Sequence, residues 1–378
     1  MKSFLNYLLF AFFFILTHFC YGQKKIELTV QFPSNIDYSK ISVQYDNGQF
    51  QKRIDPILNN NTFFFSDSCY SRYATISFCY PDSTEKDGIP CFSFFLNEKP
   101  AMISFYHDSL LNTNPFGKFK SLNAISFSDM GEAEFSKFVA TESKDAKNFY
   151  FLNKDSFSQN EKLLTTLNEK LEKVSKRELE FIKTNANLYY SFWFFSHDLA
   201  GSHLLKADSL LRFYNQVFPD SLKRTYEGSE IIKKLKGRID TKRGGEAPNF
   251  NAKDIKGNII SLRNLRGKYI LLDFWASWCG PCIRLTPSIK EIRDKYSKDK
   301  LEIISVTLDN DYNEFQAALK KADTNWIQIF NDKDLVNKYA IAPIPQIYLI
   351  DVNGIVIYNM EQENDYQLEK LKQILTYM

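Results

Sequence analysis

Two cysteines separated by two residues, Cys279 and Cys282, are the side chains in this sequence best suited to chemistry. They lie in the segment Trp278-Cys279-Gly280-Pro281-Cys282, which follows an apolar run and opens an expected helix. The unpaired N–H groups at a helix start favour an anion, so the thiol pKa of Cys279 should be lowered and Cys279 should be the nucleophile. Cys282, one turn further on and more buried, should resolve a mixed disulfide. The spacing therefore predicts a redox-active Cys279–Cys282 disulfide.

A structural zinc site and a purely structural disulfide are the alternatives for the same spacing. A closed zinc site needs four ligands, and no second Cys pair or His pair follows, because every His precedes Gly244. We therefore expect no metal here. The position between a strand and a helix favours a redox pair over a structural disulfide.

Asp273 is the acidic residue expected beside this pair. It lies six residues before Cys279, within an apolar strand over residues 270–275. Burial would raise its pKa and let it pass a proton to or from Cys282. The alternative is a carboxylate at a strand end, exposed to water. We favour the first interpretation because the cysteine motif follows directly.

Strands and helices alternate from Glu246 onward, which is typical of an α/β fold with parallel strands. The expected strands cover residues 269–275, 301–308, 326–330, 347–351 and 355–358. The expected helices cover residues 281–296, 312–321, 335–339 and 366–377. Asp309, which follows the second of these strands, is expected to cap a helix.

The residues before about position 125 have the period of β-strands. Ile26, Leu28 and Val30 alternate with polar side chains, and similar runs recur between Gly, Pro, Asn and Asp clusters. This pattern predicts an antiparallel β domain over residues 23–125. Within it, Cys79 and Cys91 face each other in an expected hairpin. Facing Cβ atoms lie ~4.5–5.5 Å apart, more than the ~3.8 Å of a disulfide, so both the bonded and the unbonded state remain open.

A helical segment is expected over residues 126–243. Leu164, Leu167, Leu171 and Val174 recur at three- and four-residue spacing, as on the buried face of a helix. Further helices are expected over residues 188–199, 207–217 and 229–235. Residues 241–245 end the segment as a linker, and we expect its cations to be a solvated hinge.

Several segments of residues 244–378 carry a family resemblance. They are Glu246-Ala247-Pro248-Asn249-Phe250, Gly267-Lys268, Leu272-Asp273-Phe274-Trp275-Ala276-Ser277 and the cysteine motif. They resemble the thioredoxin superfamily, and more closely the TlpA/ResA-like extracytoplasmic thiol–disulfide oxidoreductases. The resemblance implies a thioredoxin-like α/β domain over residues 244–378 that reduces protein disulfides. The residues before it resemble the uncharacterised β domain that often precedes such domains in secreted proteins of the Bacteroidetes type.

The resemblance also implies roles for residues around the cysteines. Pro345 matches the family's cis-proline, which faces the active disulfide, and Asp273 matches its buried acid. Ile344 and Trp278 would form an apolar rim that prefers extended peptide substrates. No tightly bound cofactor is implied, and a membrane thiol-transfer protein would supply the reducing equivalents.

Two positions depart from the family's pattern. Leu285 stands three residues after the second cysteine, where reductases of the ResA kind usually carry Glu. This departure weakens the carry-over of cytochrome c maturation as the task. Gln346 follows Pro345, where Thr is frequent, and it could change how a substrate strand pairs beside the site.

The N-terminus has the features of a secretory signal peptide over residues 1–22. Lys2 precedes an apolar run at residues 8–16, and Cys20 and Gly22 are small residues before Gln23. The run is shorter than the ~20 residues of a membrane span, so cleavage is favoured over a retained membrane anchor. We therefore expect an extracytoplasmic protein of the periplasm or cell envelope.

Composition excludes several classes of protein. With 48 Lys and Arg against 45 Asp and Glu, the net charge of +3 argues against a nucleic-acid binder. The 44% hydrophobic and 25% charged residues exclude wholesale disorder. Two further functions remain as alternatives: a thiol peroxidase of the same fold, against which the cysteine spacing argues, and an envelope scaffold protein. The second arises because about 220 residues stand between the signal peptide and residue 244, enough to recruit a partner.

Overall fold

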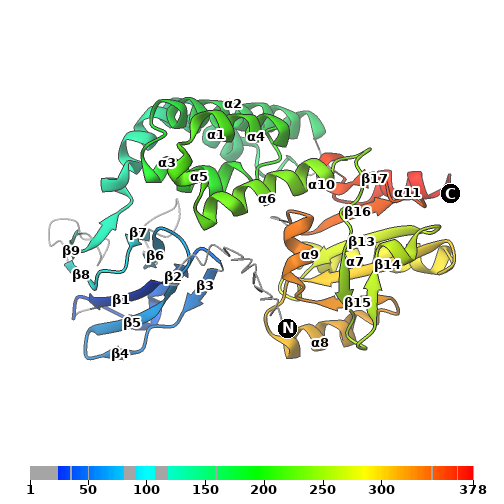
Figure 1. Cartoon of the computed structure of the whole chain (residues 1–378), viewed down its shortest axis with the longest axis horizontal. Coiled ribbons are helices and arrows are strands. Elements are labelled where there is room, and N and C mark those ends of the chain that lie inside the picture. Colours follow the sequence, from blue (N-terminus) through cyan, green and yellow to red (C-terminus); the bar gives the residue numbers. More distant parts are fainter. Residues whose placement is uncertain are drawn as a thin grey trace, which may run out of the picture. The chain divides into compact units, whose positions relative to one another are not determined.

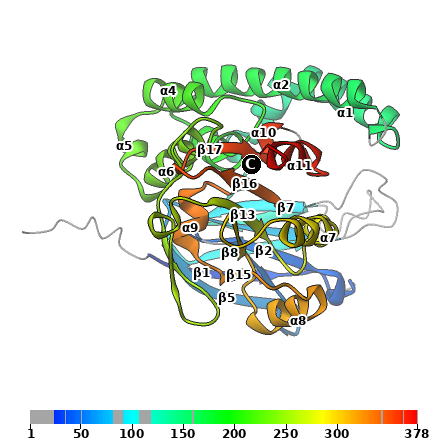
Figure 2. The same cartoon turned by 90° about the vertical axis from the view of Figure 1, so that its right-hand side faces the viewer.

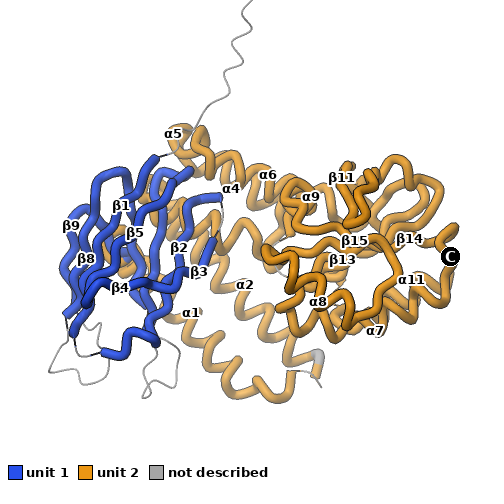
Figure 3. The backbone as a smooth tube through the Cα atoms, turned by 90° about the horizontal axis from the view of Figure 1, so that it is seen from below, with its two compact units in different colours: residues 1–127 blue, residues 128–378 orange. Residues whose placement is uncertain are grey.

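The computed structural model describes residues 24–34, 36–49, 51–80, 91–106, 118–157, 160–341, 344–363 and 365–377. The signal peptide predicted over residues 1–22 lies outside these ranges. The chain divides into two compact units, residues 1–127 and residues 128–378 (Figure 3). Within the described ranges, no helix combines the length and the apolar character that a membrane crossing requires.

The first unit contains two five-stranded sheets. One has the order β4-β5-β1-β8-β9 and the other β10-β7-β6-β2-β3. Their strands are β1 (Lys24–Gln31), β2 (Ser42–Asp46), β3 (Gln51–Ile54), β4 (Leu58–Asn59), β5 (Thr62–Cys69), β6 (Ala74–Cys79), β7 (Cys91–Leu96), β8 (Ala101–Tyr106), β9 (Lys118–Leu122) and β10 (Ala124–Ser126).

The alternation of apolar residues predicted the buried faces of this unit. Ile26, Leu28 and Val30 of β1 are buried and share a core with residues of both sheets. The other strand pairs of the two sheets are antiparallel, as expected, and the exception is β1, which pairs with β8 in parallel. Parallel neighbours need a long connection, and here the chain between them also builds β2, β3, β6 and β7 of the other sheet.

Cys79 and Cys91 form a disulfide between β6 and β7. They are direct partners in the strand register, and their Cα atoms are 4.1 Å apart. Facing residues of antiparallel strands usually have Cα atoms ~4.5–5.5 Å apart. Because these two strands are closer than that at Cys79 and Cys91, the two sulfurs can bond. Cys69 is buried, and its Sγ donates to the carbonyl oxygen of Ser71 at 3.3 Å.

The second unit begins with helices. Helices α1 (Glu132–Asn153) and α2 (Glu161–Thr184) lie side by side (Figures 1 and 2). Helix α3 (Tyr189–Phe194) continues into a π-helical turn, Phe195–Leu199, and is followed by α4 (Ala207–Val217), α5 (Asp220–Lys223) and α6 (Tyr226–Asp240). The leucine spacing predicted α2. Helix α1 has no comparable apolar stripe in its sequence, because the residues it buries are only Phe135, Val139 and Ala146.

A mixed sheet forms the centre of the thioredoxin-like domain (Figure 1). Its order is β15-β14-β13-β16-β17, with β13 (Tyr269–Trp275), β14 (Leu301–Thr307), β15 (Ile327–Phe330), β16 (Gln346–Ile350) and β17 (Val356–Asn359). Strands β13, β14 and β15 are parallel, whereas β16 and β17 run antiparallel to their neighbours. The parallel strands expected of the α/β fold are β13, β14 and β15, whereas the direction of β16 and β17 was not predicted, because residue periodicity predicts a strand but not its direction.

Helices cover both faces of this sheet. Helices α7 (Gly280–Lys295) and α11 (Glu369–Leu375) pack on the face that carries Leu271, Ile347 and Leu349. Helix α9 (Lys333–Lys338) packs on the opposite face. The remaining elements are a hairpin of β11 (Asn251–Lys253) and β12 (Ile259–Ser261), and helices α8 (Tyr312–Ala322) and α10 (Met360–Glu363). The single helix expected at residues 366–377 is α11, which is shorter than expected, and α10 is an additional turn that precedes it.

The segment expected to be a solvated hinge is bonded to the sheet. Thr241 is buried, the N–H of Gly244 donates to the carbonyl of Val356 at 2.8 Å, and the N–H of Val356 donates to that of Gly245 at 2.9 Å. Lys242 and Arg243 are exposed, as expected for solvated cations, but the backbone bonds show that the segment is not a free hinge. Composition suggests a loop at these residues, but the backbone hydrogen bonds that hold it come from residues more than a hundred positions away.

Candidate active site

The two cysteines lie at the start of α7 and form a disulfide, with Cα atoms 5.3 Å apart. Cys279 is the N-cap residue, and Pro281 stands in the first turn, where it removes no helical hydrogen bond. The backbone N–H of Cys282 donates to Sγ of Cys279 at 3.2 Å. The same N–H would stabilise a thiolate at Cys279 after reduction, because helix starts favour negative charge.

Burial does not distinguish the two sulfurs. Cys279 is 5% exposed and Cys282 is 4% exposed, so Cys282 is more buried, as expected, but by too little to separate the roles of the two residues. The difference between the two lies in their positions: Cys279 stands outside the first helical turn and accepts the N–H of Cys282. The assignment of nucleophile and resolving cysteine therefore depends on the helix start and not on exposure.

An apolar cluster surrounds the disulfide. It consists of Trp275, Ala276, Phe315 and the two cysteines, and Ile344 is one of the partly buried residues packed against it. The Ile344–Pro345 peptide bond is cis, as the resemblance implies. The structure thus brings the segment before β16 to the cysteines from a distant part of the sequence.

Trp278 has the most exposed large side chain of the motif. It is 64% exposed, which leaves the indole ring accessible to another molecule directly beside Cys279. An exposed aromatic side chain next to a reactive group is a common anchor for an incoming peptide. The structure places Trp278 at the surface and Ile344 against the buried cluster.

Asp273 is buried within β13, directly opposite Ser305 of β14. The Ser305 hydroxyl donates to Oδ2 of Asp273 at 2.8 Å, and Trp326 Nε1 donates to Ser305 Oγ at 2.8 Å. Burial raises the pKa of Asp273 to about 7, against the opposing effect of the Ser305 hydrogen bond. The interpretation of Asp273 as an exposed strand-end carboxylate is therefore wrong.

Strand alternation places Asp273 on the face of the sheet covered by α7. Successive side chains of a strand point to opposite faces, so Asp273 shares a face with Leu271 and Trp275. Leu271 packs in one cluster with Leu285 of α7, and Trp275 packs with the cysteines. The carboxyl group of Asp273, whose pKa is about 7, thus lies under the helix that begins at the disulfide. Leu285, which departs from the Glu of the family's pattern, packs against the sheet as an apolar residue of that helix.

Asp309 is a site residue that the sequence analysis assigned wrongly. It was expected to cap a helix, but the side chain that caps α8 is Asp311. Asp309 is buried and accepts two bonds from Ser277, from the backbone N–H at 2.9 Å and from the hydroxyl at 2.7 Å. It therefore holds the turn that leads into Trp278 and Cys279. Asp309 and Asp311 are only two positions apart, so only their hydrogen bonds show that Asp311 caps the helix and Asp309 binds the turn at Ser277.

Side chains that could hold a metal ion are not grouped in the part of the chain that the structure describes. Across those ranges, no three His, Cys, Asp or Glu side chains are arranged as a ligand set. His203 faces Glu361, with Nδ1 3.7 Å from Oε1. His197 stacks on Trp193 and contacts its carbonyl oxygen at 2.9 Å.

Comparison with known proteins identifies relatives of this part of the chain. Residues 244–359 match the AhpC/TSA family. The thiol-disulfide oxidoreductase ResA of Bacillus thuringiensis subsp. konkukian is 34% identical over 134 residues, which cover 35% of this chain and 78% of the relative. The thioredoxin-like protein YneN of Bacillus subtilis is 31% identical over 124 residues, covering 32% of this chain and 72% of YneN.

A solved structure is also similar to this chain. The crystal structure of the thioredoxin domain of a thiol-disulfide oxidoreductase from Bacteroides vulgatus has 27% sequence identity and a TM-score of 0.32. The similarity covers 35% of this chain and 97% of that one.

Proposed function

Because the chain belongs to the ResA-like thiol–disulfide oxidoreductases of the thioredoxin superfamily, we propose that it reduces protein disulfides outside the cytoplasm through Cys279 and Cys282. The observation that carries this proposal is the N-cap position of Cys279, where the N–H of Cys282 points at its sulfur. A thiolate held in this way is the attacking species in disulfide exchange.

The reaction takes two exchange steps. The Cys279 thiolate attacks one sulfur of the substrate disulfide, a bond between Cys279 and that sulfur forms, and the other substrate sulfur leaves as a thiolate that takes up a proton. Cys282 then loses its proton and attacks Cys279, which forms the Cys279–Cys282 disulfide and releases the second substrate thiol. Two electrons and two protons pass to the substrate in each cycle.

Asp273 is proposed to accept the proton of Cys282. Its pKa of about 7 leaves the carboxyl group divided between its two protonation states at neutral pH. A group with such a pKa is efficient as a general base and then as a general acid. Its position under α7, among side chains that exclude water, supports transfer at the helix start over exchange with bulk solvent.

Trp278, Ile344 and Pro345 are proposed to bind the substrate. The exposed indole of Trp278 offers apolar area beside Cys279. Ile344, which is distant in sequence, packs against the cluster that contains the two cysteines. An extended peptide that contacts both regions would hold its disulfide near the attacking sulfur. Protein disulfides in extended or unfolded segments are therefore the proposed substrates.

The reduced enzyme must be regenerated by a thiol donor. For an extracytoplasmic protein we propose a membrane thiol-transfer protein, which would reduce the Cys279–Cys282 disulfide by the same exchange chemistry. A recruiting role of residues 23–243 is compatible with this activity. Deleting only the first unit, residues 23–127, which leaves α6 in place, should preserve insulin reduction and weaken activity on a native target if that unit recruits it.

Reduction of insulin by the purified protein with dithiothreitol tests the proposal. Wild-type protein should reduce insulin, Cys279→Ser should not, and Cys282→Ser should accumulate a mixed disulfide that mass spectrometry assigns to Cys279. Insulin reduction at the wild-type rate by Cys279→Ser would contradict the proposal. Turnover of hydrogen peroxide in place of insulin would favour the thiol peroxidase alternative.

A further inference from the structure

Gln346, the residue that directly follows Pro345, is linked to helix α6 by a chain of buried amide groups. Gln346 and Asn359 begin β16 and end β17, respectively, and both are buried. Nε2 of Gln346 donates to Oδ1 of Asn359 at 2.9 Å, and Nδ2 of Asn359 donates to the carbonyl oxygen of Thr241 at 3.0 Å. Thr241 is the C-cap residue of α6, so this chain joins the C-terminal end of the helix to the residue beside Pro345.

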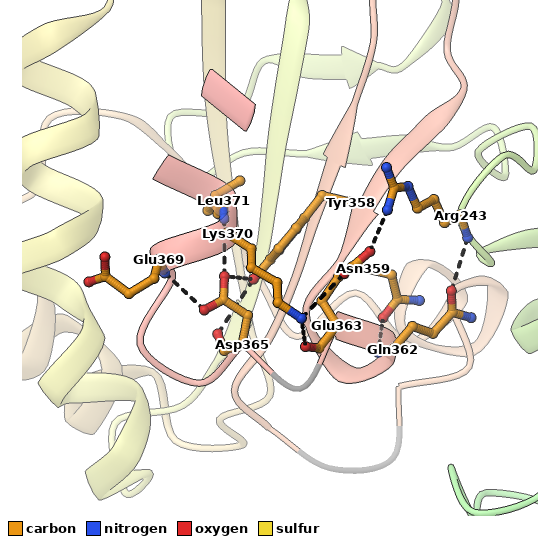
Figure 4. A network of polar contacts seen from close by, with 9 residues as sticks. All are labelled: Arg243, Tyr358, Asn359, Gln362, Glu363, Asp365, Glu369, Lys370 and Leu371. Carbon is orange, nitrogen blue, oxygen red and sulfur yellow. Dashed lines mark hydrogen bonds and ion pairs between the residues drawn. The ribbon is translucent and has the colours of Figure 1, made fainter. Parts of the chain in front are cut away.

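Asn359 is fixed in this position by a further bond. Its Oδ1 also accepts the backbone N–H of Gln362 at 3.3 Å, and Gln362 Oε1 accepts the N–H of Arg243 at 3.0 Å (Figure 4). The Arg243 guanidinium reaches Glu363 at 2.9 Å, but Arg243 is 61% exposed and such surface pairs contribute little. Besides the backbone bonds of Gly244 and Gly245 with Val356, the buried amides are therefore the main contacts that join residues 241–243 to the sheet.

A second contact of α6 lies on the other side of Ile344 and Pro345. A Cβ atom on Gly237 would lie 2.7 Å from the carbonyl oxygen of Lys338 and 2.9 Å from Cβ of Ala340. The backbone of α6 therefore touches the end of α9 at a distance that only glycine allows. Ala340 precedes Ile344 by four residues, so α6 contacts the chain both before and after the Ile344-Pro345 segment.

Helix α6 is itself tied to the rest of the helical segment. The guanidinium of Arg238 donates to the carbonyl oxygens of Ala200, Ser202 and Leu205 at 3.0, 2.6 and 3.1 Å. One face of α6 thus binds the other helices while its C-terminal end contacts the chain around Pro345. Gln346 in turn pairs with Phe274 of β13, the strand that leads to the cysteine motif.

We propose that α6 is a positioning element of the oxidoreductase site, and that Gln346, Asn359 and Gly237 are positioning residues that set where Ile344 and Pro345 meet a peptide substrate. This inference rests on the proposed substrate role of these two residues. A displacement of about 1 Å in a substrate-aligning group can reduce the rate substantially. The helical segment thereby acts on substrate binding without touching the cysteines.

Two single substitutions test the two contacts separately. Gln346→Met has nearly the same volume and removes the bond to Asn359, and Gly237→Ala forces α6 away from Lys338 and Ala340. Lys236→Ala, on the exposed side of the same helix, is the matched control. Each protein is assayed with a peptide that contains one disulfide and with a low-molecular-weight aromatic disulfide, and its fold is checked by circular dichroism.

The expected result is a rise in KM for the peptide of about five-fold in each variant, because a shift of Ile344 and Pro345 by much less than ~1 Å should cost less than the ~100-fold of a misplacement of about 1 Å. Turnover of the small disulfide and the thiol pKa of Cys279, measured by the pH dependence of alkylation, should stay at the wild-type values, as should all constants of Lys236→Ala. A merely structural role would reduce both activities equally, in proportion to the folded fraction.

Two outcomes overturn the inference, and they are distinct. Unchanged peptide KM in both folded variants, or equal losses on both substrates, contradicts the positioning role alone. Wild-type protein that reduces the small disulfide but not the peptide contradicts the proposed function and, with it, the inference that rests on it.

Discussion

Ser305 donates its hydroxyl to Asp273 from the directly opposite position on the neighbouring strand, at 2.8 Å. This hydrogen bond lowers the pKa of the Asp273 carboxyl group, but burial raises it by more, so that the pKa is about 7. One hydrogen bond from a neutral hydroxyl replaces only part of the hydration that a carboxylate has in water. The pair thus maintains an acid that can change its protonation state near neutral pH.

The stability of the protein should depend on pH through Asp273. A carboxyl group with a raised pKa binds its proton more tightly in the folded state, so wild-type protein loses stability as pH rises from about 4 to about 7. Asp273→Asn cannot ionise. Relative to wild type, its free energy of unfolding should rise by up to about 4 kcal/mol across this window, because burial raises the pKa of Asp273 to about 7 in the folded protein. Urea unfolding at pH 4 and pH 8 measures this difference, and a difference that is the same at both pH values would show that Asp273 is not perturbed.

The same substitution should separate turnover from binding. If Asp273 moves the proton of Cys282, Asp273→Asn should lower kcat for insulin reduction and leave KM near the wild-type value. Steady-state kinetics from pH 6 to pH 9 test this. Kinetics identical to wild type over that range would exclude the proton-transfer role.

Asp309 should matter for the geometry before Cys279. Asp309→Ala leaves the N–H and hydroxyl of Ser277 without their acceptor, so we expect a loss of about 2 kcal/mol in stability and slower insulin reduction by the folded protein. Asp311→Ala is the matched control, because it removes the N-cap of α8 at a cost of about 1 kcal/mol. The control should keep wild-type activity. Equal activity of the two folded variants would argue against a role of Asp309 at the site.

Trp278→Ala should weaken the binding of peptide substrates with little effect on folding. The side chain is 64% exposed, and surface substitutions usually change stability by less than about 0.5 kcal/mol. We expect a higher KM for insulin, unchanged reduction of a small disulfide and an unchanged unfolding midpoint. Tyr377→Ala, at an aromatic residue near the end of the chain that is 91% exposed, should change none of these. A peptide KM unaffected by Trp278→Ala would remove this residue from the substrate surface.

The Cys79–Cys91 disulfide should stabilise the first unit only. The two residues are 12 positions apart, and closing a loop of this length contributes about 3 kcal/mol by restricting the unfolded chain. The double variant Cys79→Ala, Cys91→Ala should therefore lower the unfolding midpoint of the β unit and leave insulin reduction at the wild-type rate. Calorimetry and the insulin assay measure the two effects. A loss of insulin reduction in a folded double variant would show that this disulfide takes part in the reaction.

Local sequence properties determined much of the site. The two-residue spacing, Pro281 and the preceding apolar run placed Cys279 and Cys282 at a helix start, because capping and helix initiation depend on neighbouring residues. The strand predicted at residues 269–275 is the observed β13, and the helix predicted at 312–321 differs from α8 by one residue. The apolar strand around Asp273, together with the cysteine motif and the family resemblance, favoured a buried Asp273 with a raised pKa over an exposed carboxylate.

Contacts between distant residues had to be seen in three dimensions. Two acidic residues stand near the start of α8, and only the acceptor geometry assigns Asp311 to the helix and Asp309 to Ser277. The linker was expected to be a solvated hinge, yet Thr241 is buried and bonded to Asn359, a partner 118 positions away. Similarly, periodicity predicted β16 but could not show that it runs antiparallel, since strand direction depends on the path of the connecting chain. Hydrogen-bond partners of buried polar groups are set by tertiary packing, and for that reason the chain from Gln346 to α6 became visible only in the folded structure.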